Sequence, residues 1–308
     1  MHRNIEVAVP SHLSSHILEA LLNNPNVINV VINENASLKP MGDSLSLFVL
    51  NKGTDDVLKV IAKITKGEEY TVITSEVASL NDPAHQEKID RDIDEAIWEE
   101  LETGLRHNGR LTENYSILMF VGGIIAAVCL ISDMPDLIFA FISASIIAPG
   151  LEPLAKIPLG IVLLNKSVLT TGIKASLVGY TLLLLAAALS FFLMDEFGTI
   201  TKEDFMQNKV TQGLLQFKLE HFLFSFAASV ASITMYLSYR RNVIAGPLIA
   251  LIFIPATAAI GIALYLTEWF YAGLFLKRLL IDVGVFITVG IILIIYKQKT
   301  VHKRKPIR

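Results

Sequence analysis

The chain has 308 residues, of which 53% are hydrophobic and 18% charged, and its mean hydropathy is +0.54. So large an apolar fraction exceeds what one soluble domain buries and predicts a protein in contact with a lipid bilayer. The net charge of −3 gives no broad basic surface, so we expect no nucleic-acid partner. The single cysteine, Cys129, excludes an internal disulfide and lies in an apolar run, where we interpret it as a small core residue.

Residues 1–80 predict a small α+β domain. Short β-rich runs and helical patterns alternate in the order βαββαβ, with turn-forming residues at each break. This order is typical of the ferredoxin-like fold, in which two helices cover one face of a four-stranded antiparallel sheet. The name describes shape alone, because the cysteines of an iron–sulfur site are absent. The expected strands are Ile5–Val9, Val27–Ile32, Leu45–Leu50 and Tyr70–Ser75, and the expected helices are Leu13–Asn23 and Thr54–Thr65.

Residues 81–112 predict an amphipathic connecting helix. The composition turns acidic between Asp82 and His107, and apolar residues recur about one helical turn apart. They are Ile89, Ile93, Ile97, Leu101 and Leu105. Two interpretations stay open: the helix couples the first domain to the membrane, or it only packs on that domain or at a subunit interface.

Residues 113–297 predict a transmembrane domain of about six helices. A span needs roughly 20 apolar residues at about 1.5 Å each. Six runs meet this length, at 115–133, 137–164, 168–194, 219–239, 243–267 and 270–296.

Orientation follows from the positions of Lys and Arg, which accumulate in cytoplasmic loops and at cytoplasmic helix ends. In a six-helix topology one side receives Arg106, Arg110, Lys166, Arg240, Arg241 and the basic tail at 298–308. The other side receives Asp133, Asp136 and Glu268, with Lys277 and Arg278 as local exceptions. We therefore expect a multi-pass protein of a prokaryotic plasma (inner) membrane with both termini in the cytoplasm. The N-terminus lacks the continuous apolar stretch of a secretory signal, which agrees with that location.

The second span carries Pro149, Gly150 and Pro153 near its middle, and the fifth carries Pro247 and Pro255. Each proline removes a backbone donor, and the freed carbonyl must find a partner in protein or in a water-lined cavity. We therefore expect both helices to be interrupted. Similar strings in the two spans suggest two three-helix repeats of inverted orientation, an architecture that many secondary transporters share. The alternative is chance resemblance, because Pro and Gly are common in membrane helices.

Three ionisable residues lie inside the predicted spans: Glu152, Lys156 and Asp282. Such groups are unfavourable in a bilayer and are candidate functional residues. Glu152 and Lys156 are four residues apart and could pair on one helix face. We expect Asp282 to have no partner nearby in the sequence, so that it would need Lys156, a freed backbone amide or a bound cation. The alternative is a Glu152–Lys156 pair that only fixes helix packing.

Three segments resemble a known family: Ala-Ile-Trp-Glu-Glu-Leu-Glu at 96–102, the run from Ser143 to Gly160, and the run from Ile244 to Pro255. Their order is similar to that of the prokaryotic membrane proteins called domain of unknown function three-eighty-nine, the "uncharacterised hydrophobic domain" family. The chain departs from that pattern at Ala256, where a second proline is usual, and at Asp282, where asparagine is usual. The resemblance implies a plasma-membrane protein and supplies neither an activity nor a substrate.

The sequence contains no Walker loop, dinucleotide glycine pattern, His-Glu-x-x-His motif or nucleophile elbow, so we expect no enzyme, cofactor or metal. The first hypothesis is a transporter or channel-like protein for an ion or small polar solute, regulated by its cytoplasmic domain. Its path would be lined by Glu152, Lys156, Asp282, Pro149, Gly150, Pro153, Pro247 and Pro255. The second is a membrane-anchored sensor or assembly scaffold whose first domain binds a ligand or partner. Small residues such as Gly122 and Gly123 permit close helix packing, and we expect a homo-oligomer.

Overall fold

The computed structural model describes residues 2–131, 137–198, 200–238, 245–304 and 306, and the side chains of 108, 137–141 and 245–250 are not described. Contacts divide the chain into two compact units. One comprises Met1–Glu100 with Gln298–Arg308, and the other comprises Leu101–Lys297. The predicted charges Asp133, Asp136, Arg240, Arg241, Lys305 and Arg308 lie outside the described residues.

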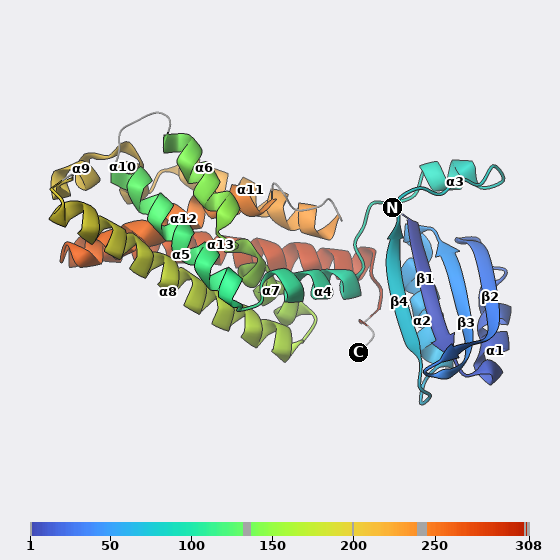
Figure 1. Ribbon diagram of the computed structural model, residues 1–308. Helices are drawn as coiled ribbons and strands as arrows, with labels where there is room; N and C mark the ends of the chain where they lie inside the picture. Colours follow the sequence, from blue (N-terminus) through green and yellow to red (C-terminus); the bar gives the residue numbers. More distant parts are fainter. Residues whose placement is uncertain (1, 132–136, 199, 239–244, 305, 307–308) are drawn as a thin grey trace. The chain divides into compact units, whose positions relative to one another are not determined.

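The first unit is built on a four-stranded antiparallel sheet in the order β2-β3-β1-β4, as Figure 1 shows. The four strands and two helices predicted for residues 1–80 form where the sequence pattern indicated, with the strands longer by up to six residues at an end. Their bounds are β1 His2–Val9, α1 Ser11–Leu21, β2 Val27–Leu38, β3 Met41–Val49, α2 Thr54–Ile64 and β4 Thr71–Val77, with a single 3-10 turn, η1, at Asn51–Gly53.

One face of this sheet packs against α1 and α2 to form a hydrophobic core. Along β1, Ile5, Val7 and Val9 are fully buried while Glu6 is exposed, which is the period-two alternation of a half-buried strand. Ile17 of α1 and Val57 of α2 belong to the same buried cluster, so both helices cover the same face. The negative first turn of α2, with two aspartates, matches the positive end of its helix dipole.

The predicted connecting helix is wrong as a continuous element. The chain forms two helices, α3 Gln86–Asp90 and α4 Trp98–Asn108, joined by a non-helical stretch. Contacts with Asn51 and Lys52 keep that stretch non-helical. Asp92 accepts from the amides of Asn51 and Lys52, and Asn51 Nδ2 donates to the carbonyls of Ile93 and Glu95 at 2.9 and 2.7 Å. Backbone carbonyls bound in this way are not available for helical hydrogen bonds.

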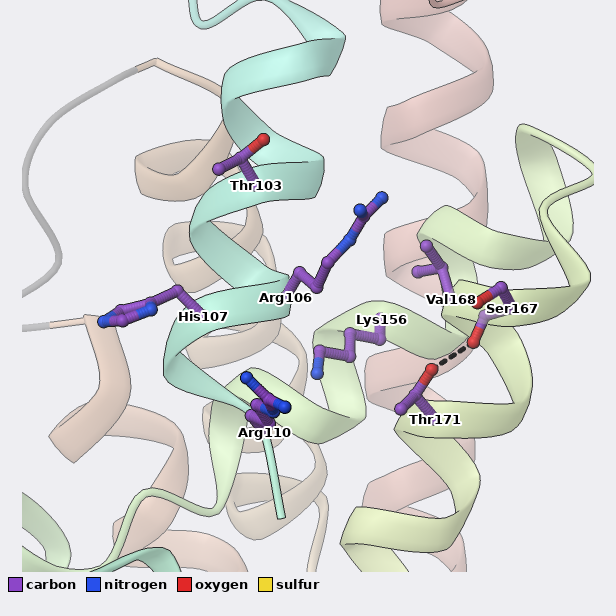
Figure 2. Close-up of a pocket in the computed structure, with 8 residues that line it drawn as sticks. All are labelled: Thr103, Arg106, His107, Arg110, Lys156, Ser167, Val168 and Thr171. Atoms are coloured by element: carbon purple, nitrogen blue, oxygen red, sulfur yellow. Dashed lines mark hydrogen bonds between the residues drawn. The ribbon is translucent and has the colours of Figure 1, made fainter. Parts of the chain in front are cut away.

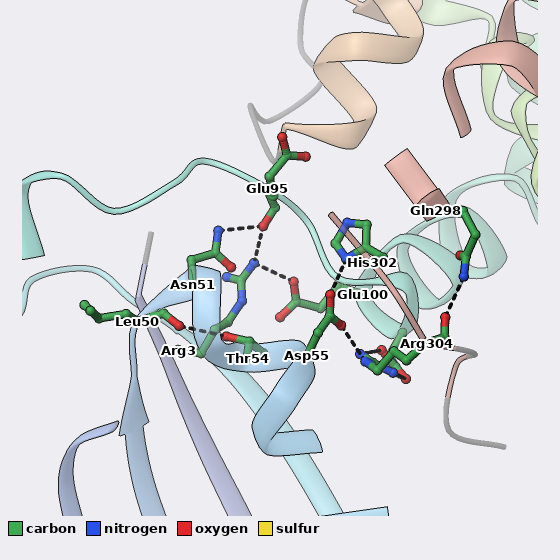
Figure 3. Close-up of polar contacts among 11 residues, drawn as sticks. Arg3, Leu50, Asn51, Thr54, Asp55, Glu95, Glu100, Gln298, His302 and Arg304 are labelled. Atoms are coloured by element: carbon green, nitrogen blue, oxygen red, sulfur yellow. Dashed lines mark hydrogen bonds and ion pairs between the residues drawn. The ribbon is translucent and has the colours of Figure 1, made fainter. Parts of the chain in front are cut away.

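The C-terminal tail binds back onto the first unit, as Figure 3 shows. Arg304 donates two hydrogen bonds to the carboxylate of Glu99, at 2.6 and 2.7 Å, and also pairs with Asp55. Nδ1 of His302 lies 2.5 Å from Asp55 Oδ2, and its ring centroid lies 4.6 Å from that of Trp98. Sequence analysis used Arg304, as part of the basic tail, only to infer membrane orientation, and it gave His302 no role.

The second unit is helical throughout its described elements, and most of its helices are apolar. It also contains most of α4. Their bounds are α5 Glu113–Ile131, α6 Leu137–Ile147, α7 Leu151–Val162, α8 Lys166–Glu196, α9 Lys202–Gln207, α10 Lys209–Leu215, α11 Leu219–Leu237, α12 Ala245–Tyr265 and α13 Trp269–Thr300. Asn165 caps α8 by accepting from the amides of Ser167 and Val168. The core of this unit gathers buried side chains of α5, α8 and α12, and Figure 1 shows α5 and α8 side by side.

Three helices of the described residues, α5, α8 and α13, are long and apolar enough to cross a membrane, and Leu251–Tyr265 of α12 is a shorter apolar helix. Gly122 and Gly123 of α5 are used for packing inside the chain. A Cβ atom on Gly122 would lie 2.7 Å from Ala148 Cβ, and one on Gly123 would lie 2.4 Å from the carbonyl oxygen of Leu183. These glycines therefore give no support to the expected homo-oligomer, which stays a prediction.

Candidate functional site

The predicted interruption of the second span is present. Helix α6 ends at Ile147 and α7 begins at Leu151, and Ala148, Pro149 and Gly150 between them belong to neither helix. Pro149 has no amide hydrogen, and the amide of Gly150 instead donates to the carbonyl of Ala148 at 2.8 Å. The break thus places the first turn of α7 inside the apolar unit. Pro153 lies in that turn, where the backbone N–H that proline lacks would have no partner within the helix.

Glu152 lies in that first turn and faces an aromatic, hydroxyl-rich environment. The hydroxyls of Tyr115 on α5, Tyr180 on α8 and Tyr236 on α11 are close enough to interact electrostatically with its carboxylate. Tyr115 donates to the carbonyl of Ala175 at 2.8 Å, and Tyr180 donates more weakly to that of Gly150 at 3.3 Å. Oε2 of Glu152 and Oη of Tyr236 are buried, and these two side chains interact with each other as hydrogen-bonding partners.

Lys156 does not form the predicted ion pair with Glu152. Its Nζ donates instead to the carbonyl of Gly109 at 2.6 Å, and the side chain is 1% exposed. The stem is held from two sides, because a Cβ on Gly109 would lie 3.1 Å from Lys156 Cε and one on Gly172 would lie 2.7 Å from Lys156 Cβ. The close approach of α8 at Gly172 and of the chain at Gly109 directs the ammonium group toward residues that precede α5.

Asp282 has two partners, so the expectation of an acid without a neighbouring partner is wrong. Nε of Arg278 lies 2.7 Å from its Oδ2, four residues earlier on α13, and Oγ of Ser225 donates to Oδ1 at 2.5 Å. Both charged side chains are buried, at 3% exposure for Asp282 and 7% for Arg278. Asp282 also lines a different pocket from Lys156, so the structure does not bring the three ionisable residues into one site.

The fifth predicted span is not interrupted at its second proline. Helix α12 continues through Pro255, and Pro247 falls in its first turn, where a proline fits; the side chain of Pro247 lies outside the described residues. Pro255 alone removes one backbone hydrogen bond from the helix, and the backbone N–H of Ala256 is available for the next one. The break in α6/α7 contains a proline followed directly by glycine, and this pair ends the helix.

Among the described residues, no group of three or more His, Cys, Asp or Glu side chains could hold a metal ion. The polar chemistry of the site therefore consists of one carboxylate, tyrosine hydroxyls and backbone carbonyls freed at the break. Such a set can bind a proton, a cation or a small polar molecule.

A family model described as domain of unknown function (DUF389) matches residues 145–296. The chain belongs to the DUF389 family. No curated protein and no solved structure matches the chain. The DUF389 match runs from the end of α6 to α13 and contains Glu152, Lys156 and Asp282, whereas the sheet of the first unit lies outside it.

Three tyrosines and Arg278 are the site residues that sequence analysis missed. Arg278 was detectable, because a spacing of four residues places it beside Asp282 on a helix. The tyrosines come from three helices, and no local pattern predicts that they converge on Glu152.

Proposed function

We propose that this DUF389 protein crosses a prokaryotic plasma membrane six times, through α5, the broken pair α6/α7, α8, α11, α12 and α13. The support is the length and apolar character of α5, α8 and α13 and the lysines and arginines on one side of the predicted topology. Both termini are then cytoplasmic.

We propose two finer features of the fold. The strand order β2-β3-β1-β4 with both helices on one face supports a ferredoxin-like first domain. Two groups of three proposed spans would have opposite orientations, which supports an inverted repeat. Helix α12 departs from this symmetry, because it is unbroken where its counterpart α6/α7 is broken.

We propose that the protein is a transporter or channel-like protein for an ion or small polar solute, with Glu152 as the central residue of its path. One observation carries this proposal: the Glu152 carboxylate is buried at a helix break, and its hydrogen-bonding neighbour is the hydroxyl of Tyr236 and not a cationic side chain. An ionisable group inside a membrane span is unfavourable and marks a candidate functional residue. A site that receives a transient solute or proton accounts for this arrangement.

The test is flux in proteoliposomes, with protons, alkali cations and small anions presented across a defined gradient. Glu152→Gln should reduce flux of the transported species by roughly tenfold or more, because the variant removes the charge from the path. Glu220→Gln, at an exposed acid in the first turn of α11, is the matched control and should leave flux unchanged. Equal flux in both variants would remove Glu152 from the path.

Asp282 stays a predicted path residue, and its ion pair requires a second variant. Asp282→Asn leaves Arg278 buried without its charged partner, so loss of flux alone could reflect misfolding. The double variant Arg278→Met with Asp282→Leu removes both charges together and should keep the fold. Normal flux in a folded double variant would exclude Asp282 from the path.

The second candidate function is a membrane-anchored sensor or assembly scaffold. The observation that favours it is the first unit itself, which binds the C-terminal tail and leaves one sheet face uncovered, with Val31 and Ile73 about half exposed. Cysteines introduced beside Glu152 in a Cys129→Ala background separate the two functions. Reaction with an aqueous thiol reagent supports a path, and uniform inertness supports an anchor.

A further inference from the structure

A basic pocket lies at the end of the second unit that the proposed topology assigns to the cytoplasm. Its volume is about 560 Å³. Figure 2 shows Lys156 of α7 between the end of α4 and the first turns of α8. The lining residues are Thr103, Arg106, His107, Arg110, Lys156, Ser167, Val168 and Thr171.

Positive charge in this pocket exceeds negative charge. Arg106 pairs with Glu102 at 2.5 Å, so its charge is partly balanced. Arg110 has no ion pair or hydrogen bond to any described residue, and the hydrogen-bond acceptor of Lys156 among these residues is a neutral carbonyl. Arg110 and Lys156 therefore contribute positive charge that no residue lining the pocket neutralises.

Lys156 is the buried charged residue of this pocket. Its ammonium group has three donors and uses one of them, on Gly109, although the side chain is 99% buried. The carboxylate of Glu152 interacts with this ammonium group only at a distance. A buried charge with no counter-charge in direct contact is strongly unfavourable unless a bound group of opposite sign compensates it. The glycines at 109 and 172 hold its stem in place, so the ammonium cannot turn away to solvent without moving α7 or α8.

The other lining groups suit an oxyanion. Arg106 and Arg110 offer planar guanidinium donors, which bind phosphate oxygens in pairs. The hydroxyl of Ser167 lies on the first turn of α8, whose positive dipole end also favours an anion. The hydroxyl of Thr171, one turn later, donates to the carbonyl of Ser167 and is not a free donor. A phosphate group has enough oxygens to use guanidinium, ammonium and hydroxyl donors together.

We propose that this pocket binds a phosphate group, carried either by an anionic phospholipid headgroup or by a free phosphate compound. Binding at equilibrium needs no transport, so the proposal is tested separately from the proposed path, although Lys156 is also one of the residues predicted to line that path.

The experiment measures binding to the full-length protein in a neutral detergent. One arm titrates inorganic phosphate, and the other titrates short-chain phosphatidylglycerol, with phosphatidylcholine of the same chain length as the uncharged reference. Arg110→Gln is the test variant, because Arg110 is exposed and the fold does not depend on a contact of its side chain. Arg91→Gln removes the same charge at a side chain of the first unit that is 78% exposed, and serves as the matched control.

Saturable binding of phosphate or phosphatidylglycerol that Arg110→Gln weakens roughly tenfold, while Arg91→Gln changes it less than about twofold, is the expected result. Binding of phosphate identifies a free phosphate compound as ligand, and binding of phosphatidylglycerol alone identifies a lipid headgroup. Absence of binding in both arms, equal binding of the two lipids, or equal effects of the two variants would overturn the proposal.

Discussion

At the scale of single residues, the surroundings of Asp55 explain how this acid binds the C-terminal tail. Burial by itself raises the pKa of Asp55, but the hydrogen bond with His302 and the charge of Arg304 outweigh burial and hold the pKa below its usual range. The ionised form is therefore the one that binds the C-terminal tail. Glu100 shows the opposite balance, because burial raises its pKa more than the charge of Arg3 lowers it.

The sign of the pH dependence follows from that shift. An acid with a depressed folded-state pKa contributes stability that is present above its unfolded pKa, about 3.9, and is lost as the pH falls through the folded value. We predict that tail docking is intact at pH 7 and is lost as the pH falls below about 4. Asp55→Asn should destabilise docking by roughly 1–3 kcal/mol at pH 7.

Trp98 supplies the measurement, because its ring contacts that of His302. In a Trp269→Phe background its emission reports docking alone, since the chain has 2 tryptophans. Asp56→Asn is the control, at an exposed neighbour in the same first turn of α2. If Asp55→Asn and Asp56→Asn gave the same emission at pH 7, the assigned role of Asp55 would be wrong.

At the scale of elements, glycine positions decide how closely the helices of the second unit approach. Helix α8 crosses α7 at Gly172, where a Cβ would lie 2.7 Å from Lys156 Cβ and 2.8 Å from the carbonyl oxygen of Pro153. The backbone at Pro153 and the confined side chain of Lys156 cannot easily move to make room for such a Cβ atom. Gly273 of α13 is the contrasting case, because a Cβ there would have no neighbour within 4 Å.

We predict that Gly172→Ala destabilises the protein by roughly 1–3 kcal/mol, because the added methyl forces α7 and α8 apart. Gly273→Ala should be neutral or stabilising by up to about 1 kcal/mol, since alanine favours a helix interior. Thermal unfolding of the full chain in detergent compares the two variants. Similar midpoints would show that α7 and α8 can adjust at Gly172.

At the scale of the whole molecule, the proposed orientation makes a prediction about access from outside the cell. Lys39 is exposed on the first unit, and Lys209 is exposed at the start of α10, on the opposite side in the six-span topology. In a Cys129→Ala background, a membrane-impermeant thiol reagent applied to intact cells should label Lys209→Cys and leave Lys39→Cys unlabelled. Both sites should react after lysis, and the reverse pattern in intact cells would invert the topology.

The sequence by itself determined the kinds of element and where they lie. Period-two alternation located the four strands, long apolar runs located α5, α8, α11, α12 and α13, and the Pro149-Gly150 pair predicted the break between α6 and α7. These signals are local, because backbone geometry links neighbouring side chains to one face or one turn. The same local argument failed for residues 91–97, where side chains from the first unit bind the backbone.

Only the tertiary structure decided which polar groups meet. Asp55 contacts a tail nearly 250 positions later, Lys156 donates to Gly109, and Tyr236 lies beside Glu152. Helical spacing favoured a Glu152–Lys156 pair, but close packing at two glycines directed the lysine elsewhere. Partners so distant in the chain are brought together by the packing of whole helices. The residue pattern within one segment does not predict that packing.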